Sequence, residues 1–103
     1  MKVRFSPAAQ ADLIDIALFI AQDNPTRALK FVDELESKCD TLGGAPGIGT
    51  ARPELGAGIR VLPHGRYLIF YREAMQGLRI ERILHSARDT SGEDFETDDL
   101  LGG

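Results

Sequence analysis

The sequence predicts a small α+β fold in which a short strand and an antiparallel helical hairpin come before three antiparallel strands. Two patterns support this prediction. Apolar residues in the first half recur twice at helical spacing, each time after a proline, and the second half contains three runs rich in β-branched and aromatic residues. The predicted order is β-α-α-β-β-β, with the hairpin packed on one face of a small, mainly antiparallel sheet.

The first strand leads directly into the first helix. Val3 and Phe5 alternate with charged neighbours, which is the pattern of a short strand with one buried face. Ser6 then supplies an N-cap hydroxyl, and Pro7 occupies the first helical position, where a missing N–H costs nothing. Apolar residues at helical spacing extend this helix to about residue 22, with Asp12 predicted on the side away from the core.

The second helix begins with the same signal, Asn24 followed by Pro25, and Gly43 is a natural left-handed end for it. Because the linker at residues 23–24 is too short for anything but a tight connection, the two helices are predicted to form an antiparallel hairpin. The apolar stripe of the second helix comprises Ala28, Phe31, Val32, Leu35, Cys39 and Leu42.

Residues 43–58 contain six glycines and two prolines and are predicted to form a surface loop. Three strand-like runs follow, joined by turns that are short enough for an antiparallel meander. They span residues 59–62, 67–72 and 78–85. In the last run Ile83 falls on the opposite face from Ile80, which predicts a bulge near Arg82 or a strand covered on both faces.

Charge is distributed unevenly along the chain, whose formal net charge is −4. Residues 44–90 contain seven arginines, no lysine and four carboxylates, whereas the C-terminus is acidic. Arginine without lysine favours directional contacts with carboxylates, phosphates or aromatic faces. We therefore predict a folded domain at residues 1–89 and an acidic tail at residues 90–103, which is either solvated or ordered by a partner through Phe95 and Leu100.

The same sequence disfavours several other classes of protein. Its longest apolar run, residues 16–21, is far below the roughly 20 residues of a membrane span, so a cytoplasmic protein without membrane contact is expected. The single cysteine, Cys39, cannot form an internal disulfide and is predicted to be a small buried hydrophobe. No motif indicates a metal or a cofactor, since the glycines at residues 47–49 lack the preceding strand and the third glycine of a dinucleotide fingerprint.

Three separated motifs resemble the toxins of the RelE/ParE superfamily, and most closely those of its ParE branch. They lie at residues 58–60 (GIR), 64–72 (HGRYLIFYR) and 83–89 (ILHSARD). The opening at residues 5–9 (FSPAA) and the predicted helical hairpin are similar to the same family. The resemblance covers about residues 2–89 and implies the toxin of a type II toxin–antitoxin module.

The resemblance also implies partners and a target. A small ParD-like antitoxin is expected to hold the toxin inactive by wrapping a flexible C-terminal part over the helices and sheet, in a two-to-two heterotetramer or a larger assembly. DNA is expected to be bound only through the antitoxin. ParE-type members are associated with inhibition of DNA gyrase, whereas RelE-type members are ribosome-dependent mRNA endoribonucleases, and the shared fold does not distinguish the two.

The residues at the nuclease positions favour a non-catalytic toxin. A metal-free ribonuclease needs Arg, Lys, His, Tyr or Glu side chains placed closely around the ribose 2′-hydroxyl and the phosphate. RelE-like nucleases typically carry a middle-strand arginine where this chain has Leu68, and they have lysines before the sheet, whereas the last lysine here is Lys38. If the chain is a nuclease after all, its expected catalytic residues are His85, Arg88 and Arg66.

Arginines are the main candidates for binding a target or an antitoxin. The predicted set comprises Arg60, Arg66, Arg72, Arg82 and Arg88. Cross-strand ion pairs with Glu73 and Glu81 are the simplest interpretation of the arginines on the last two strands. His64 is predicted to be a turn residue, and His85 a structural residue hydrogen-bonded to nearby backbone. We also expect an amphipathic antitoxin helix to dock on the apolar surface of the hairpin while its carboxylates meet the arginines.

Overall fold

The computed structural model describes residues 1–87 and confirms the predicted element order. One short strand and one 3-10 turn are additions to the sequence prediction, and both lie in the glycine-rich loop. The elements are β1 (Val3–Phe5), α1 (Pro7–Ala21), α2 (Pro25–Gly44), β2 (Thr50–Ala51), η1 (Pro53–Leu55), β3 (Arg60–His64), β4 (Tyr67–Ala74) and β5 (Gly77–His85).

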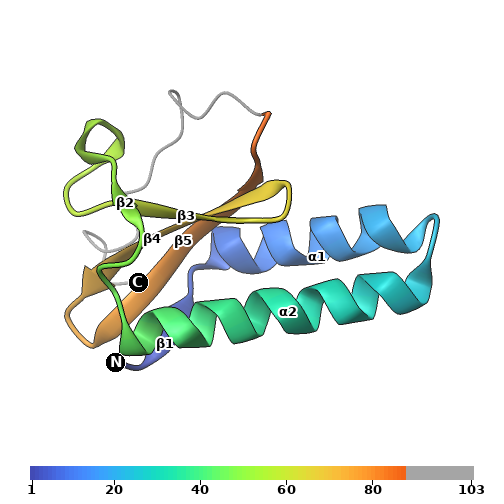
Figure 1. Ribbon diagram of the computed structural model, residues 1–103, viewed down its shortest axis with the longest axis horizontal. Helices are drawn as coiled ribbons and strands as arrows, with labels where there is room; N and C mark the ends of the chain where they lie inside the picture. Colours follow the sequence, from blue (N-terminus) through green and yellow to red (C-terminus); the bar gives the residue numbers. More distant parts are fainter. Residues whose placement is uncertain (88–103) are drawn as a thin grey trace.

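The strands form one sheet in the order β1-β5-β4-β3-β2, and both helices cover one of its faces (Figure 1). Neighbouring strands are antiparallel except β1 and β5, which are parallel. Parallel strands need a long crossover, and here the helical hairpin and the meander lie between the two paired strands. The first and last strands of the described chain therefore lie side by side, and the opposite face of the sheet carries no helix.

Both helices begin where the sequence predicts. The Ser6 hydroxyl accepts a hydrogen bond from the Ala9 N–H at 2.9 Å and donates one to the Glu81 carbonyl at 2.7 Å, so the cap also ties α1 to β5. The Asn24 side chain accepts from the Arg27 N–H at 3.1 Å. Each helix has a proline in its first turn, as predicted.

The predicted role of Gly43 as a left-handed helix end is wrong. Helix α2 continues to Gly44, and Gly43 is not among the glycines with a positive φ angle in residues 1–87. Its carbonyl instead accepts a hydrogen bond from the Met1 ammonium group at 2.6 Å, and a Cβ atom on Gly43 would lie 2.4 Å from the Met1 carbonyl oxygen. Glycine is needed here because the N-terminus packs directly against the end of α2.

The predicted irregularity of the last strand is a bulge at Glu81. Phe70 pairs with Arg82 and Tyr71 pairs with Ile80, so Glu81 has no partner in the register. The bulge changes the face on which the following side chains lie. Ile83 consequently packs with the helices, and the next residue of the strand packs on the opposite face of the sheet.

The core is therefore divided between the two faces of the sheet. The helix-side cluster comprises Ala9, Ile16, Phe31, Leu35, Cys39, Leu42, Ile69, Tyr71, Leu78, Ile80 and Ile83. The smaller cluster on the open face comprises Ile59, Val61, Phe70 and Leu84. Cys39 is fully buried, as predicted, and burial together with the nearby Asp40 and Glu36 carboxylates raises the pKa of its thiol to about 12.

Tyr71 fixes the glycine-rich loop against the sheet. Its ring is fully buried, and its hydroxyl accepts from the Gly49 N–H and donates to the Pro46 carbonyl, both at 2.8 Å. A Cβ atom on Gly49 would lie 2.4 Å from this hydroxyl, so the close approach requires glycine. The loop thus has a defined conformation around a buried phenol.

Candidate functional site

The open face of the sheet carries a lateral row of three arginines. Arg4 pairs with Arg79 in the β1–β5 register, and Arg79 pairs with Arg72 in the β5–β4 register. Phe5, Ile80 and Tyr71, each next to one of these arginines in sequence, pack with the helix-side cluster, so the three arginine side chains lie on the face opposite the helices. We call Arg4, Arg79 and Arg72 the arginine row.

Glu81 lies beside the arginine row because of the bulge. One of its carboxylate oxygens lies 3.1 Å from Arg72 Nε and 3.3 Å from Arg79 Nε. The side chains of Arg79 and Glu81 are only 1% and 4% exposed, and that of Arg72 is 10% exposed. Like charges side by side on adjacent strands destabilise a sheet, and a carboxylate shared between two guanidinium groups offsets part of that repulsion.

A small buried apolar cluster lies on the same face of the sheet as the arginine row. It consists of the open-face cluster, with Leu55 and Leu68 packed against it. Leu68 pairs with Leu84 on β5, so the position at which RelE-like nucleases typically have an arginine is occupied by an apolar contact. This face therefore combines buried arginines with buried apolar side chains.

The described arginines of the predicted interface set do not share one surface. Arg60 donates to the Gly49 carbonyl at 2.8 Å and lies beside Tyr71, next to a pocket of about 200 Å³ that Arg72 also lines. Arg66 is exposed in the β3–β4 turn. Arg88 lies outside the described residues.

Arg82 lies apart from the arginine row and pairs with Asp12. Its Nε and Nη2 atoms donate to the two Asp12 carboxylate oxygens at 2.7 and 2.9 Å, and the Ile83 N–H donates to the same carboxylate at 2.9 Å. Asp12 therefore ties α1 to β5, and its predicted position on the outer side of the helix is wrong. The predicted ion pair of Arg72 with Glu81 is confirmed.

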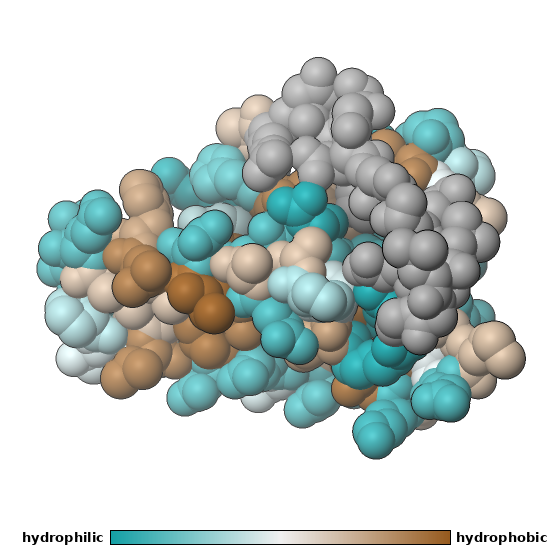
Figure 2. All heavy atoms as spheres, turned by 180° about the vertical axis from the view of Figure 1, so that it is seen from behind, coloured by the Kyte–Doolittle hydropathy of each residue, from teal (hydrophilic) through white to brown (hydrophobic). Residues whose placement is uncertain are grey.

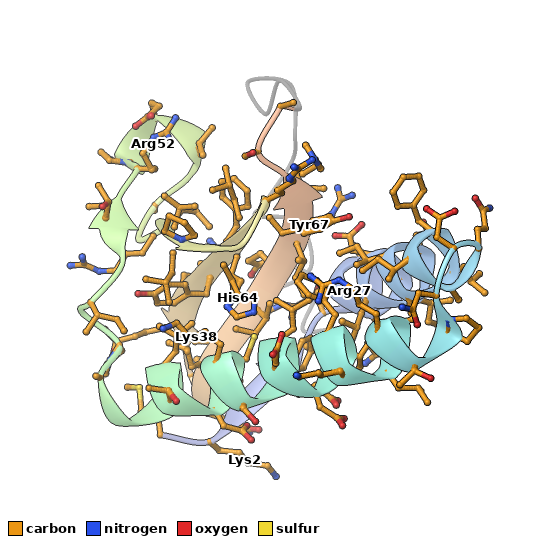
Figure 3. The ribbon with its side chains drawn as sticks, turned by 45° about the vertical axis from the view of Figure 1, so that its right-hand side comes forward. Lys2, Arg27, Lys38, Arg52, His64 and Tyr67 are labelled. Atoms are coloured by element: carbon orange, nitrogen blue, oxygen red, sulfur yellow. The ribbon has the colours of Figure 1, made fainter. Side chains whose placement is uncertain are left out.

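A cluster of aromatic and imidazole rings lies where the β3–β4 turn meets α2. The ring centroid of Phe31 lies 5.6 Å from that of His64 and 5.5 Å from that of Tyr67, which in turn lies 5.4 Å from that of His85. Figure 3 shows His64 and Tyr67 on the side of the sheet that faces α2. The spacings are those of packed rings, so these side chains join the hairpin to the end of the sheet.

Two of the three predicted nuclease residues lie at this same end of the sheet. His85 pairs with Tyr67 in the β4–β5 register, and the Ser86 N–H donates to the Arg66 carbonyl at 2.8 Å. The His85 Nδ1 atom accepts a hydrogen bond from the Ala87 N–H at 3.1 Å, as the predicted structural role requires.

The helical hairpin exposes apolar side chains. Ile14 and Leu18 lie four residues apart on α1 and are 60% and 62% exposed. Phe19 is 68% exposed, and Leu29 on α2 is 72% exposed. Figure 2 shows apolar side chains gathered over the part of the hairpin that extends away from the sheet. We call Ile14, Leu18, Phe19 and Leu29 the hairpin apolar surface.

The part of the chain that the structure describes contains neither a metal-binding cluster nor a membrane-spanning helix. Among residues 1–87 there is no group of three His, Cys, Asp or Glu side chains that could hold a metal ion. No helix within the same range is long and apolar enough to cross a membrane.

Comparison with known proteins places the chain among toxins. The family model described as the ParE toxin of the type II toxin-antitoxin system parDE matches residues 3–90. Toxin ParE1 of Caulobacter vibrioides is 33% identical over 87 residues, which cover 82% of this chain and 88% of that relative. Toxin ParE1 of Mycobacterium tuberculosis is 34% identical over 86 residues, again covering 82% of this chain and 88% of the relative.

A solved structure has the same architecture. A chain of the chromosomal ParDE TA system from P. aeruginosa superposes with a TM-score of 0.70 at 25% identity, covering 82% of this chain and 95% of that chain. The fold and the matches define a toxin of a type II toxin–antitoxin system. Within that class, the chain belongs to the ParE toxin family, which confirms the resemblance of the three sequence motifs.

Proposed function

We propose that this toxin inhibits DNA gyrase by binding it in the cytoplasm, without catalysing a reaction, and that a ParD-like antitoxin neutralises it. The main observation in support of a non-catalytic toxin is that Leu68 packs against Leu84 at the position where RelE-like nucleases typically have an arginine. A leucine can neither stabilise an anionic phosphate nor transfer a proton.

The geometry of His85 supports the same proposal. A general base must have a lone pair available, and the hydrogen bond from the Ala87 N–H occupies that of Nδ1. Arg66 lies at the same end of the sheet and could hold a phosphate, but binding alone does not activate a 2′-hydroxyl. The engagement of His85 Nδ1 by nearby backbone supports a structural role for this imidazole.

The antitoxin is proposed to bind through two surfaces. An amphipathic helix with apolar residues three and four apart matches the hairpin apolar surface, where Ile14 and Leu18 share one face of α1. Acidic residues of the antitoxin would meet Arg60, which lies on β3 between β2 and β4, and Arg66, which lies in the exposed β3–β4 turn. The family match to a toxin of the parDE system supports a ParD-like partner.

Two matched variants test the antitoxin surface. Leu18→Ser replaces an apolar side chain that is 62% exposed, and Gln22→Ser is a control at the exposed C-cap of the same helix. We expect the first to weaken antitoxin binding and the second to leave it unchanged, as measured by calorimetric titration. Equal antitoxin affinities for both variants and the wild type would show that the hairpin apolar surface is not part of the interface.

Supercoiling of relaxed plasmid by purified gyrase tests the target. The toxin, freed from antitoxin by denaturation and refolding, is expected to stop supercoiling, and added antitoxin is expected to restore it. Cleavage of mRNA on translating ribosomes is mapped in parallel with the same preparation. Active gyrase together with transcripts cut on the ribosome would replace the proposal by the endoribonuclease alternative.

A further inference from the structure

A small pocket lies where the glycine-rich loop meets β3 and β4. Its volume is about 200 Å³, and it is lined by Pro46, Gly58, Arg60, Tyr71, Arg72 and Glu73. Arg60 pairs with Tyr71 across the strands, and Glu73 lies two residues further along β4, so the two charged side chains lie on the same face of the sheet. Gly58 has open space where a side chain would begin, which leaves the pocket accessible on that side.

Hydrogen bonds fix the walls of the pocket. Tyr71 anchors one arm of the glycine-rich loop, and Arg60 Nη1 donates to the Gly49 carbonyl of the same arm at 2.8 Å. Arg72 Nη1 donates to the Ala57 carbonyl of the other arm at 3.5 Å. Both arms are thus attached to the strands, so a ligand does not have to order them when it binds.

Opposite charges flank the pocket. Arg60 and Glu73 are diagonal neighbours on antiparallel strands, a spacing of about 7–8 Å, and among residues 1–87 they do not form an ion pair with each other. A guanidinium group has five N–H donors, of which Arg60 uses one for Gly49, whereas the Glu73 carboxylate only accepts. The charge of Arg72 is offset by the Glu81 carboxylate, 3.1 Å from its Nε. The pocket therefore offers donors from β3 and an acceptor from β4.

Size and charge together define the ligand. Pockets for drug-sized molecules measure about 300–1,000 Å³, so this pocket admits a single side chain rather than a nucleotide or a cofactor. A carboxylate in the pocket would be repelled by Glu73, and an ammonium group would be repelled by Arg60. A carboxamide has an oxygen that accepts from Arg60 and an NH₂ group that donates to Glu73, so it pairs with both.

We propose that the pocket binds the carboxamide of an asparagine or glutamine side chain of the antitoxin, an inference that rests on the proposed neutralisation by such a partner. The remaining N–H groups of Arg60 can still meet an acidic residue of the antitoxin next to that carboxamide. The pocket thus adds a neutral, directional contact to a surface that is otherwise recognised through charge. It makes binding selective, because a side chain without the carboxamide would leave Arg60 or Glu73 without its hydrogen bond.

The first test uses the isolated toxin and does not require the antitoxin. The N-acetyl N-methylamides of glutamine, glutamate and lysine are titrated into ¹⁵N-enriched toxin, and the shifts of the Gly58 and Glu73 amide signals give the affinities. We expect the glutamine derivative to bind about fivefold more tightly than the other two, because it alone of the three carries both a donor and an acceptor without a net charge. Equal affinities, tighter binding of a charged derivative, or shifts confined to other parts of the chain would overturn the proposal.

A charge variant makes this result specific to the pocket. Glu73→Ala, at an exposed position, removes the acceptor for the glutamine derivative and the repulsion of the glutamate derivative, so the order of their affinities should reverse. Glu54→Ala removes an exposed carboxylate from η1, outside the pocket, and should leave the order unchanged. An unchanged order in Glu73→Ala would contradict the assignment.

The complex tests whether the carboxamide comes from the antitoxin. Glu73→Ala should weaken binding of the cognate antitoxin about fivefold, whereas Glu54→Ala should not weaken it. Tighter binding to Glu73→Ala would mean that a carboxylate occupies the pocket, and an unchanged affinity would mean that the antitoxin does not enter it; either result overturns the proposal. An antitoxin that fails to bind the wild-type toxin would instead refute the proposed function, and the titration with the three derivatives would still decide what the pocket recognises.

Discussion

Removal of the Asp12 carboxylate should destabilise the toxin more than removal of any exposed carboxylate on the same helix. Asp12 accepts two charge-assisted hydrogen bonds from Arg82 and one from the Ile83 N–H. Breaking a fully buried ion pair from one side costs about 3–5 kcal/mol, and a hydrogen bond to a charged group contributes about 1.5–3 kcal/mol. The Arg82 and Asp12 side chains are 19% and 11% exposed, so water screens the pair in part.

We therefore expect Asp12→Ala to lower the free energy of unfolding by about 2–4 kcal/mol, a large fraction of the 5–15 kcal/mol of a typical domain. Urea denaturation monitored by circular dichroism measures this loss. Asp15→Ala on the exposed side of α1 is the matched control and should change stability by less than about 0.5 kcal/mol.

A double-mutant cycle separates the ion pair from the rest of the site. Arg82→Met removes the charge that Asp12→Ala would leave unpaired, so the double variant should lose less stability than the two single variants together. Additive losses, or an Asp12→Ala variant as stable as Asp15→Ala, would refute the assignment of Arg82 to a structural tie between α1 and β5.

Three further predictions concern buried contacts. Gly43→Ala should destabilise by about 1–3 kcal/mol because its Cβ meets the Met1 carbonyl, whereas Gly44→Ala, with open space around its Cβ, should not destabilise in the same denaturation assay. Tyr71→Phe removes two hydrogen bonds and should cost about 1–3 kcal/mol and increase amide exchange in residues 46–50; unchanged exchange would contradict the anchoring role. The neutral Cys39 thiol stabilises the fold below pH 9.0, and this contribution should be lost as the pH rises towards about 12. The stability of Cys39→Ala should therefore fall less than that of the wild type over this pH range. Identical pH profiles of stability for the two proteins would contradict the prediction.

Features with local causes could be predicted from the sequence. The side chains of Ser6 and Asn24 cap the helices that follow them within three residues, and the proline after each is equally local. The bulge was also predictable near Arg82, because the apolar residues on either side of Arg82 do not follow the alternating pattern of a regular strand. The two residues of β2 gave no signal, since a strand of that length has no period.

Features that depend on contacts distant in sequence were missed. Asp12 and Arg82 are 70 residues apart, so no spacing along the chain indicated that they would pair. The arginine row depends on the register of β1 against β5, which places Arg4 beside Arg79 although their sequence contexts are unrelated. Gly43 had the right sequence for a helix end, and only the position of the N-terminus shows why glycine is required there.

The measurement that most directly tests the central claim is a supercoiling titration with wild-type toxin and with His85→Ala, each at two gyrase concentrations. A toxin that acts by binding should inhibit equally well with and without the imidazole, and the amount needed should rise in proportion to gyrase. Inhibition at amounts far below stoichiometric, or its loss in His85→Ala with the fold intact, would contradict the account and point to catalysis.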